Sequence, residues 1–259
     1  MAAIMFSITN KKVAGFTPRW AEFRGFSLLF DNPGNCLEAH GPRLDLACDV
    51  DTDPALSFYR SLRGGLTALD PDLLTAAYGF CPLPPPSYHV TVWDGGNADN
   101  GAQVTGEQRP QLEAYLAGLP DSLPAANDLT RLALASPLVQ RRDWNLEFKF
   151  DRLALWGALV ARLTPTEASR GQFERFAEER RLLNAACFEA FGIKASDNYA
   201  PHVSLGYFAN REGAHQASAH LPAWSAAFAE RMQGQTLTFA RVGLYGFTDM
   251  ASFFTSADF

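Results

Sequence analysis

Ser-Tyr-His-Val-Thr-Val-Trp-Asp, residues 87–94, is the segment around which the rest of the sequence is most simply interpreted. It is rich in β-branched and aromatic residues, prolines precede it and Gly-Gly-Asn follows it, so the sequence predicts a β-strand. Side chains alternate across a strand, so we expect His89, Thr91 and Trp93 on one face and Val90 and Val92 on the other. An imidazole and a hydroxyl then lie side by side on a strand whose opposite face can be buried.

The same pattern recurs in Tyr-Ala-Pro-His-Val-Ser-Leu-Gly, residues 199–206. Here alternation places His202 and Ser204 on one face and Val203 and Leu205 on the other. The chain therefore holds two copies of His-Val-(Thr/Ser)-aliphatic. This duplication predicts two pseudo-equivalent lobes that face each other, with one copy in each.

Strand and helix patterns are interspersed irregularly over the rest of the chain, which favours an α+β fold with two mainly antiparallel sheets and helices on the outside. Strands are expected at 25–31, 36–40, 146–151, 154–163, 236–244 and near Phe253. Helices are expected after Asp53-Pro54 (ending at Gly64-Gly65), after Asp70-Pro71, and at 108–117, 164–191 and 221–232. We predict a loosely held N-terminal arm (1–24), one bilobal domain (25–250) with an insertion at about 95–130, and a C-terminal tail (251–259).

Composition narrows the possible partners and surroundings of the chain. The 259 residues include 47% hydrophobic residues, as in a folded globular protein, and the formal net charge is −6. A protein that binds long duplex nucleic acid would usually be basic. No apolar run of about 18 residues predicts a membrane span, and the four cysteines show no Cys-x-x-Cys spacing. We therefore expect a monomer in the reducing cytoplasm, with no bound metal or other cofactor.

Two imidazoles and two hydroxyls around one cleft suit acid–base chemistry at phosphorus. A histidine has an ordinary pKa of about 6.5, so one ring can be neutral and the other protonated at neutral pH. One ring then removes a proton from a nucleophile while the other donates a proton to the leaving oxygen. Each hydroxyl can donate a hydrogen bond to a non-bridging phosphate oxygen. A metal site at His89 and His202 is the less favoured alternative, because no acidic or cysteine ligand has suitable spacing from either.

Each of these signals also has a purely structural interpretation. Either histidine alone would more often be a half-buried strand residue bonded to the backbone. Aromatic residues near the motifs are candidates for stacking a base, although such residues often pack in a core: Tyr88, Trp93, Tyr199 and Phe208. Alternation places Phe208 on the His202 face and Tyr207 on the opposite one. The basic stretch 131–181 can border a phosphate site or lie on the solvated surface.

The two motifs, His89-Val90-Thr91-Val92 and His202-Val203-Ser204-Leu205, resemble the paired His-x-(Thr/Ser)-x motifs of the 2H (two-histidine) phosphoesterase superfamily. The context, with Pro-Pro-Ser-Tyr before the first motif, is similar to a bacterial branch of that superfamily. The superfamily includes bacterial RNA 2′,3′-cyclic phosphodiesterases once named RNA 2′-5′ ligases. The resemblance implies a bilobal pseudo-twofold α+β fold, with one motif in each lobe and the active site in the groove between them.

The resemblance also implies an activity. It makes His89, Thr91, His202 and Ser204 the catalytic residues of a metal-independent phosphodiesterase acting on a cyclic phosphate or phosphodiester of a nucleotide or RNA end. The motifs lie farther apart in sequence than in the small ligase-like members. This difference bears on which substrate the protein binds more than on its catalytic chemistry. The alternative is a noncatalytic nucleotide- or RNA-binding module on the same scaffold.

Overall fold

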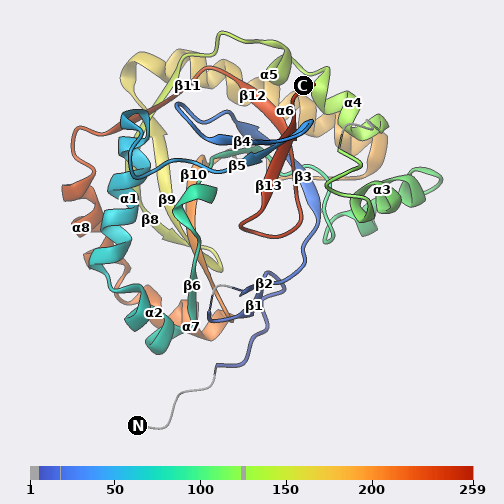
Figure 1. The fold of residues 1–259 in the computed structure, drawn as a ribbon. Helices are drawn as coiled ribbons and strands as arrows, with labels where there is room; N and C mark the ends of the chain where they lie inside the picture. The colour runs from blue at the N-terminus through green and yellow to red at the C-terminus, as the bar shows by residue number, and fades with distance from the viewer. Residues whose placement is uncertain (1–5, 18, 124–126, 259) are drawn as a thin grey trace.

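Two large antiparallel sheets and a small hairpin form the β-structure of the protein (Figure 1). The computed structural model describes residues 6–17, 19–123 and 127–258. One sheet has six strands in the order β4-β5-β13-β12-β3-β7, and the other has five in the order β11-β8-β9-β10-β6. Every strand pair in these described ranges is antiparallel, which confirms the predicted α+β class.

The strands are β1 Val13–Gly15, β2 Arg19–Trp20, β3 Gly25–Phe30, β4 Leu37–His40, β5 Arg43–Leu46, β6 Phe80–Pro82, β7 Thr91–Trp93, β8 Leu146–Leu155, β9 Ala158–Pro165, β10 His202–Phe208, β11 Thr236–Phe239, β12 Val242–Phe247 and β13 Phe253–Ser256. The α-helices are α1 Ser57–Ala68, α2 Pro71–Tyr78, α3 Gln108–Ala117, α4 Asp128–Leu134, α5 Pro137–Gln140, α6 Arg170–Phe191, α7 Arg211–Ser218 and α8 Leu221–Arg231. None of these helices combines the length and apolar character needed to cross a bilayer in the part of the chain described.

Aromatic packing joins the two sheets into one core. Phe30 on β3 stacks on Phe239 of β11, with ring centroids 4.5 Å apart, and on Phe176 of α6 at 5.0 Å. It also contacts Phe148 of β8. Removing such a buried ring typically costs about 3–5 kcal/mol. The helices lie on the outside of the molecule (Figure 1), and α6 contacts β7, so it connects the core to the first motif.

Capping residues mark some of the predicted helix ends. Asp53 and Asp70 accept backbone N–H bonds at the starts predicted for them, and α6 ends at Gly192 in the left-handed conformation, as predicted. The predicted end of α1 at Gly64-Gly65 is wrong, because the helix continues to Ala68. A Cβ on Gly65 would lie 2.8 Å from the Phe228 ring, so this glycine permits close packing of α1 on α8.

Some predicted strand boundaries are also wrong. The segment 154–163 contains a turn at Trp156-Gly157, where Gly157 has φ +80°, so its first residues belong to β8. The segment 236–244 breaks near Ala240, and its halves join different sheets as β11 and β12. In the first motif, regular strand covers only residues 91–93, because Ser87 closes a 3₁₀ turn, Pro85–Ser87.

The predicted arm and tail are both built into the fold. Thr9 and Asn10 bond through their backbone N–H groups to Ala209, so the described part of the arm is tied to the end of β10. The tail supplies β13, which lies between β5 and β12. The predicted helix at 108–117 is α3. The ends of the arm and tail (1–5 and 259), residue 18 and the insertion residues 124–126 lie outside the described residues.

Two glycines test how tightly the turn after the first motif is constrained. Gly95 and Gly106 have φ of +61° and +68°, but only a Cβ on Gly95 would overlap the carbonyl oxygen of Phe26. We expect Gly106→Ala to cost about 1–2 kcal/mol from the left-handed backbone alone. Gly95→Ala should cost a further 1–3 kcal/mol or so, because β7 must move away from β3. Urea unfolding of both variants measures the difference, and equal losses would contradict this account.

Candidate active site

The two motifs meet at a single backbone pairing. Val90 and Val203 form an isolated antiparallel bridge, and both side chains are fully buried. The bridge brings the edge strand β7 of one sheet against β10 of the other. Continuing this register by one residue in each direction places His89 opposite Ser204 and Thr91 opposite His202. The two histidines are then diagonal neighbours, which lie about 7–8 Å apart in an antiparallel pair, with their Cβ atoms somewhat closer.

Both histidines are held by the same hydrogen bond. Nδ1 of His89 lies 2.8 Å from the carbonyl oxygen of Ser87, and Nδ1 of His202 lies 2.8 Å from that of Ala200. A carbonyl oxygen only accepts, so Nδ1 carries the proton in each neutral ring. Nε2 is therefore left with a free lone pair on both rings, the atom that can accept or deliver a proton.

A β-bulge follows each hydroxyl at the equivalent motif position. In β7, Thr91 and Trp93 pair with the adjacent residues Leu29 and Leu28. In β10, Ser204 and Gly206 pair with the adjacent residues Val160 and Leu159. Each motif strand therefore carries one extra residue, Val92 or Leu205, which interrupts simple alternation along the strand.

This interruption corrects the stacking roles predicted for Trp93 and Phe208. Trp93 is 0% exposed beside Phe26, and Phe208 is 1% exposed beside Phe80. Both rings are therefore part of the core. Tyr207, which was predicted to point away from the His202 face, is half-buried and lines a cavity next to the active site.

Of the two remaining predicted stacking residues, only Tyr199 lines a cavity together with Thr91 and His202 of the motifs. Tyr88 is 1% exposed and packs edge-on against Tyr59, so the prediction for it is also wrong. Tyr199 is half-buried, and its hydroxyl donates to the carbonyl oxygen of Thr91 at 3.1 Å. This bond ties the segment before the second motif to the strand of the first.

A cavity of about 380 Å³ lies beside the paired strands. It is lined by residues of both motif regions, including Thr91, His202, Tyr199 and Asp94, and by two arginines. Arg162 of β9 pairs directly with His202 in the sheet. Arg180 of α6 is 4% exposed and donates to the carbonyl oxygens of Val92 at 2.6 Å and Ser196 at 2.7 Å.

The sequence did not single out Arg162 or Arg180. Both lie within the basic stretch 131–181, which also contains Arg131, Arg141 and Arg152. Those three form ion pairs with nearby aspartates. Arg162 and Arg180 reach the site only because β9 pairs with β10 and α6 packs on β7, and no local pattern encodes these contacts.

Burial lowers the pKa of both histidines. The pKa of His89 falls from 6.5 to about 4, chiefly by desolvation, opposed by the Ser87 carbonyl and reinforced by the charge of His202. The pKa of His202 is also lowered by desolvation, but Asp94 and the Ala200 carbonyl raise it, while Arg162 and Lys12 lower it. Both rings are therefore neutral at pH 7, and only His202 has a carboxylate, Asp94, that favours its protonated form.

Each histidine also contacts an aromatic ring. The imidazole of His89 lies 4.3 Å from the Phe253 ring of β13, measured between centroids. The imidazole of His202 meets the Trp156 indole edge-on at 5.4 Å, and Trp156 is 54% exposed. In the described residues, no group of three or more His, Cys, Asp and Glu side chains is arranged to hold a metal ion.

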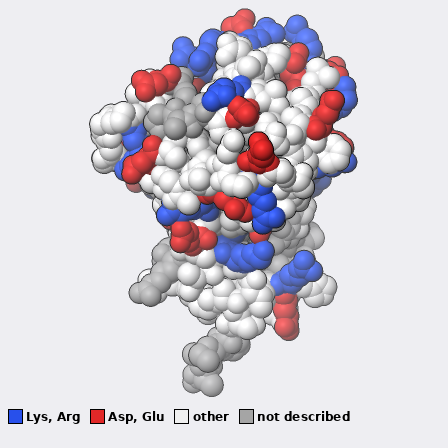
Figure 2. All heavy atoms as spheres, turned by 90° about the vertical axis from the view of Figure 1, so that its right-hand side faces the viewer, with Lys and Arg blue, Asp and Glu red and all other residues white. Residues whose placement is uncertain are grey.

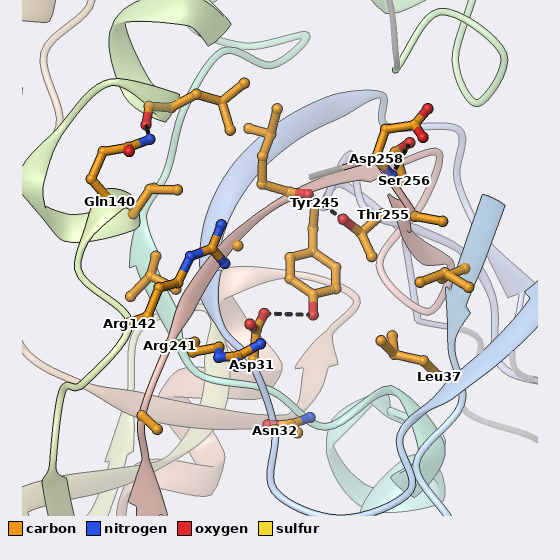
Figure 3. Close-up of a pocket in the computed structure, with 18 of the residues that line it drawn as sticks. Asp31, Asn32, Leu37, Gln140, Arg142, Arg241, Tyr245, Thr255, Ser256 and Asp258 are labelled. Atoms are coloured by element: carbon orange, nitrogen blue, oxygen red, sulfur yellow. Dashed lines mark hydrogen bonds between the residues drawn. The ribbon is translucent and has the colours of Figure 1, made fainter. Parts of the chain in front are cut away.

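A larger cavity lies elsewhere, and no residue of either motif lines it. It measures about 660 Å³ and includes Arg142, Arg241, Asp31 and Tyr245 (Figure 3). The Tyr245 hydroxyl donates to Asp31 at 3.0 Å, and burial raises the pKa of this carboxyl group. The motif histidines and this cavity are thus separate features of the molecule.

Comparison with solved structures shows the fold. The conserved protein ATU0111 from Agrobacterium tumefaciens aligns with 98% of this chain and 94% of its own, with 13% identity and a TM-score of 0.50. The chain has the fold of ATU0111. Similar structures also include Escherichia coli LigT with phosphate (12% identity, TM-score 0.42, 91% and 95% coverage) and Kluyveromyces marxianus Usb1 with uridine monophosphate (9%, 0.38, 90% and 97%). No family profile and no curated protein matches the chain.

The lowered histidine pKa values predict how stability depends on pH. A histidine whose pKa is lower in the folded state stabilises the fold above pH 6.5, and this contribution is lost as the pH falls toward 4. For His89 the full loss is at most about 3 kcal/mol. His89→Gln should flatten the fall in the free energy of unfolding between pH 6.5 and 4, measured by urea titration. His215→Gln, at an exposed position on α7, is the control. An unchanged slope in His89→Gln would contradict the burial of a neutral ring.

Proposed function

We propose that the protein is a metal-independent phosphodiesterase that acts on a cyclic phosphate or phosphodiester at a nucleotide or RNA end. The observation that carries this proposal is the Val90–Val203 bridge, which brings two equivalent histidine–hydroxyl pairs to one place. Both histidines keep Nε2 free, and each lies across from the other motif's hydroxyl. This arrangement supplies a base, an acid and two phosphate-binding hydroxyls.

In this mechanism His89 is the base and His202 is the acid. Burial lowers the pKa of His89, and no carboxylate opposes this shift, so its Nε2 stays unprotonated and able to remove a proton from water. The water oxygen bonds to phosphorus as the bond to the leaving ribose oxygen breaks. His202, whose affinity for a proton is raised by Asp94, donates its proton to that oxygen. The anionic phosphate favours the protonated form of His202 when substrate binds.

The remaining polar groups stabilise or position the phosphate. The hydroxyls of Thr91 and Ser204 donate hydrogen bonds to non-bridging oxygens, where charge accumulates in the transition state. Arg162 supplies positive charge beside His202. Arg180 is a positioning residue, because its hydrogen bond to the Val92 carbonyl holds the strand that carries Thr91.

A small or single-stranded substrate fits the surface of the molecule. Basic and acidic side chains are interspersed on the face shown in Figure 2, and the net charge is −6. Such a surface lacks the basic stripe typical of proteins on long duplexes. None of the four cysteines, all of which are buried described residues, is in a disulfide bond, which supports the reducing cytoplasm as the compartment we propose.

Hydrolysis of a 2′,3′-cyclic mononucleotide in the presence of EDTA tests this proposal. We expect His89→Ala and His202→Ala to lower kcat by about 10²–10⁴-fold, because each removes a proton-transfer group. Thr91→Val and Ser204→Ala should each cost up to about 10²-fold. His215→Ala should retain full activity. Loss of wild-type activity in EDTA, or full activity in either motif-histidine variant, would refute the proposal.

The pH dependence tests the assignment of acid and base. kcat/KM should be bell-shaped as the pH is raised. The rising limb lies near pH 4, where His89 loses its proton, and the falling limb follows the loss of the proton of His202, whose pKa burial lowers from its ordinary value. Asp94→Asn removes a charge that raises the pKa of His202. The falling limb should therefore move to lower pH while the rising limb stays in place. Movement of the rising limb alone would reverse the two roles.

The rival function is a noncatalytic nucleotide- or RNA-binding module on this scaffold. It predicts nucleotide binding by calorimetry with no turnover. It also predicts little change in affinity on replacing either motif histidine. The hydrogen bonds that leave both Nε2 atoms free favour the catalytic proposal over this one.

A further inference from the structure

A second cavity, of about 540 Å³, adjoins the active-site cavity. One wall is the N-terminal arm, with Asn10 and Lys12, and the other includes Trp156 of the β8–β9 turn and Tyr207 of β10. Trp156 lines both cavities, so its exposed indole forms the boundary between them. We call this second cavity the arm subsite.

The arm is fixed across one end of both sheets. The side-chain amide of Asn10 donates to the Phe208 carbonyl at 2.9 Å, which anchors the arm to the end of β10. Farther along, the N–H of Phe23 donates to the Thr248 carbonyl at 2.8 Å, in the turn between β12 and β13. Figure 1 shows the arm hairpin, β1 and β2, below the two sheets. The described residues between these anchors, 11–17 and 19–22, are thus held near the arm subsite.

Lys12 places a positive charge without a carboxylate partner in this subsite. Its ammonium lies 5.1 Å from the ring centroids of both Phe23 and Tyr207. The neighbouring Lys11 pairs with Asp99 at 2.8 Å, whereas no acidic side chain of the described residues pairs with Lys12. The charge of Lys12 also reaches His202. A half-buried cation held by two rings, beside an open cavity, is suited to an anionic ligand.

We propose that the arm subsite binds the nucleotide that precedes the scissile one in a single-stranded substrate. Single-stranded nucleic acid is bound by aromatic faces that stack on bases and by cations that contact phosphates, and Trp156, Tyr207 and Lys12 supply both. This inference rests on the proposed function and adds a second nucleotide subsite to that same site.

The position of His202 determines the direction of the bound strand. His202 donates its proton to the leaving ribose oxygen, so the terminal nucleoside lies on the His202 side. Trp156 lies next to His202, and the terminal base can stack on the side of the exposed indole that Arg162 does not cover. The phosphodiester on the 5′ side of that nucleoside then extends past Trp156 toward Lys12.

Two substrates of different length test the subsite. We expect kcat/KM for a trinucleotide ending in a 2′,3′-cyclic phosphate to exceed that for the cyclic mononucleotide by about tenfold or more. Lys12→Ala and Lys12→Gln should lower this ratio toward one, and Lys12→Arg should restore it. Lys149→Ala, an exposed lysine on β8, should leave the ratio unchanged. Equal kcat/KM for the two wild-type substrates, or a preference that survives in both Lys12 variants, would overturn the inference.

Binding separates failure of this inference from failure of the proposed function. A fluorescent single-stranded trinucleotide with a 3′-phosphate is titrated by anisotropy at several salt concentrations. The slope of log K against log salt should be smaller by about 0.7 in Lys12→Gln, the loss of one phosphate contact. If neither substrate is hydrolysed but this slope changes as expected, the proposed activity fails and the subsite stands. If mononucleotide hydrolysis proceeds and the slope is unchanged, the subsite fails alone.

Discussion

The pairing of Val90 with Val203 is the contact on which the site depends. Two buried valines, more than a hundred residues apart in the chain, form an antiparallel bridge where an edge strand of one sheet meets the second sheet. Burial of these side chains on one face leaves the flanking imidazoles and hydroxyls on the other. The register also decides the partners, because an antiparallel bridge sets each histidine opposite the hydroxyl of the other motif. A slip of one residue would send the histidines into the core.

The two halves of the site are equivalent in backbone and different in surroundings. Each histidine bonds through Nδ1 to the carbonyl two residues earlier, and each motif carries a bulge after its hydroxyl. The neighbouring charges are not duplicated. Asp94, Arg162 and Lys12 act on His202, whereas His89 is influenced mainly by burial. Two copies of one motif can therefore differ in proton affinity, as a base and an acid must.

Local sequence signals predicted the fold class and many elements but misplaced several boundaries. The caps at Asp70 and Gly192 are local, and the helix start at Asp70 and the helix end at Gly192 were predicted correctly. The predicted start of the second helix at residue 164 is wrong, because Thr164 and Pro165 belong to β9 and α6 begins at Arg170. Gly65 predicted a helix end, yet α1 continues through it to Ala68. The glycine is explained by a distant contact, because the Phe228 ring occupies the space that a side chain would fill. The tail and arm look peripheral in sequence but are held by strand pairing and by backbone hydrogen bonds. Such errors arise wherever a long-range contact outweighs the local preference.

The sequence alone pointed to the residues that we propose as catalytic: the two motifs put imidazole and hydroxyl on one face and valine on the other, through the local geometry of a strand. The tertiary structure decided what surrounds them. Bulges after Thr91 and Ser204 interrupt the alternation, and Trp93 and Phe208 lie in the core. Arg162, Arg180 and Trp156 reach the site through strand pairing, helix packing and a turn, which are contacts between distant segments. Alternation is a property of the nearest neighbours in the chain, whereas register, bulges and packing depend on which strands meet.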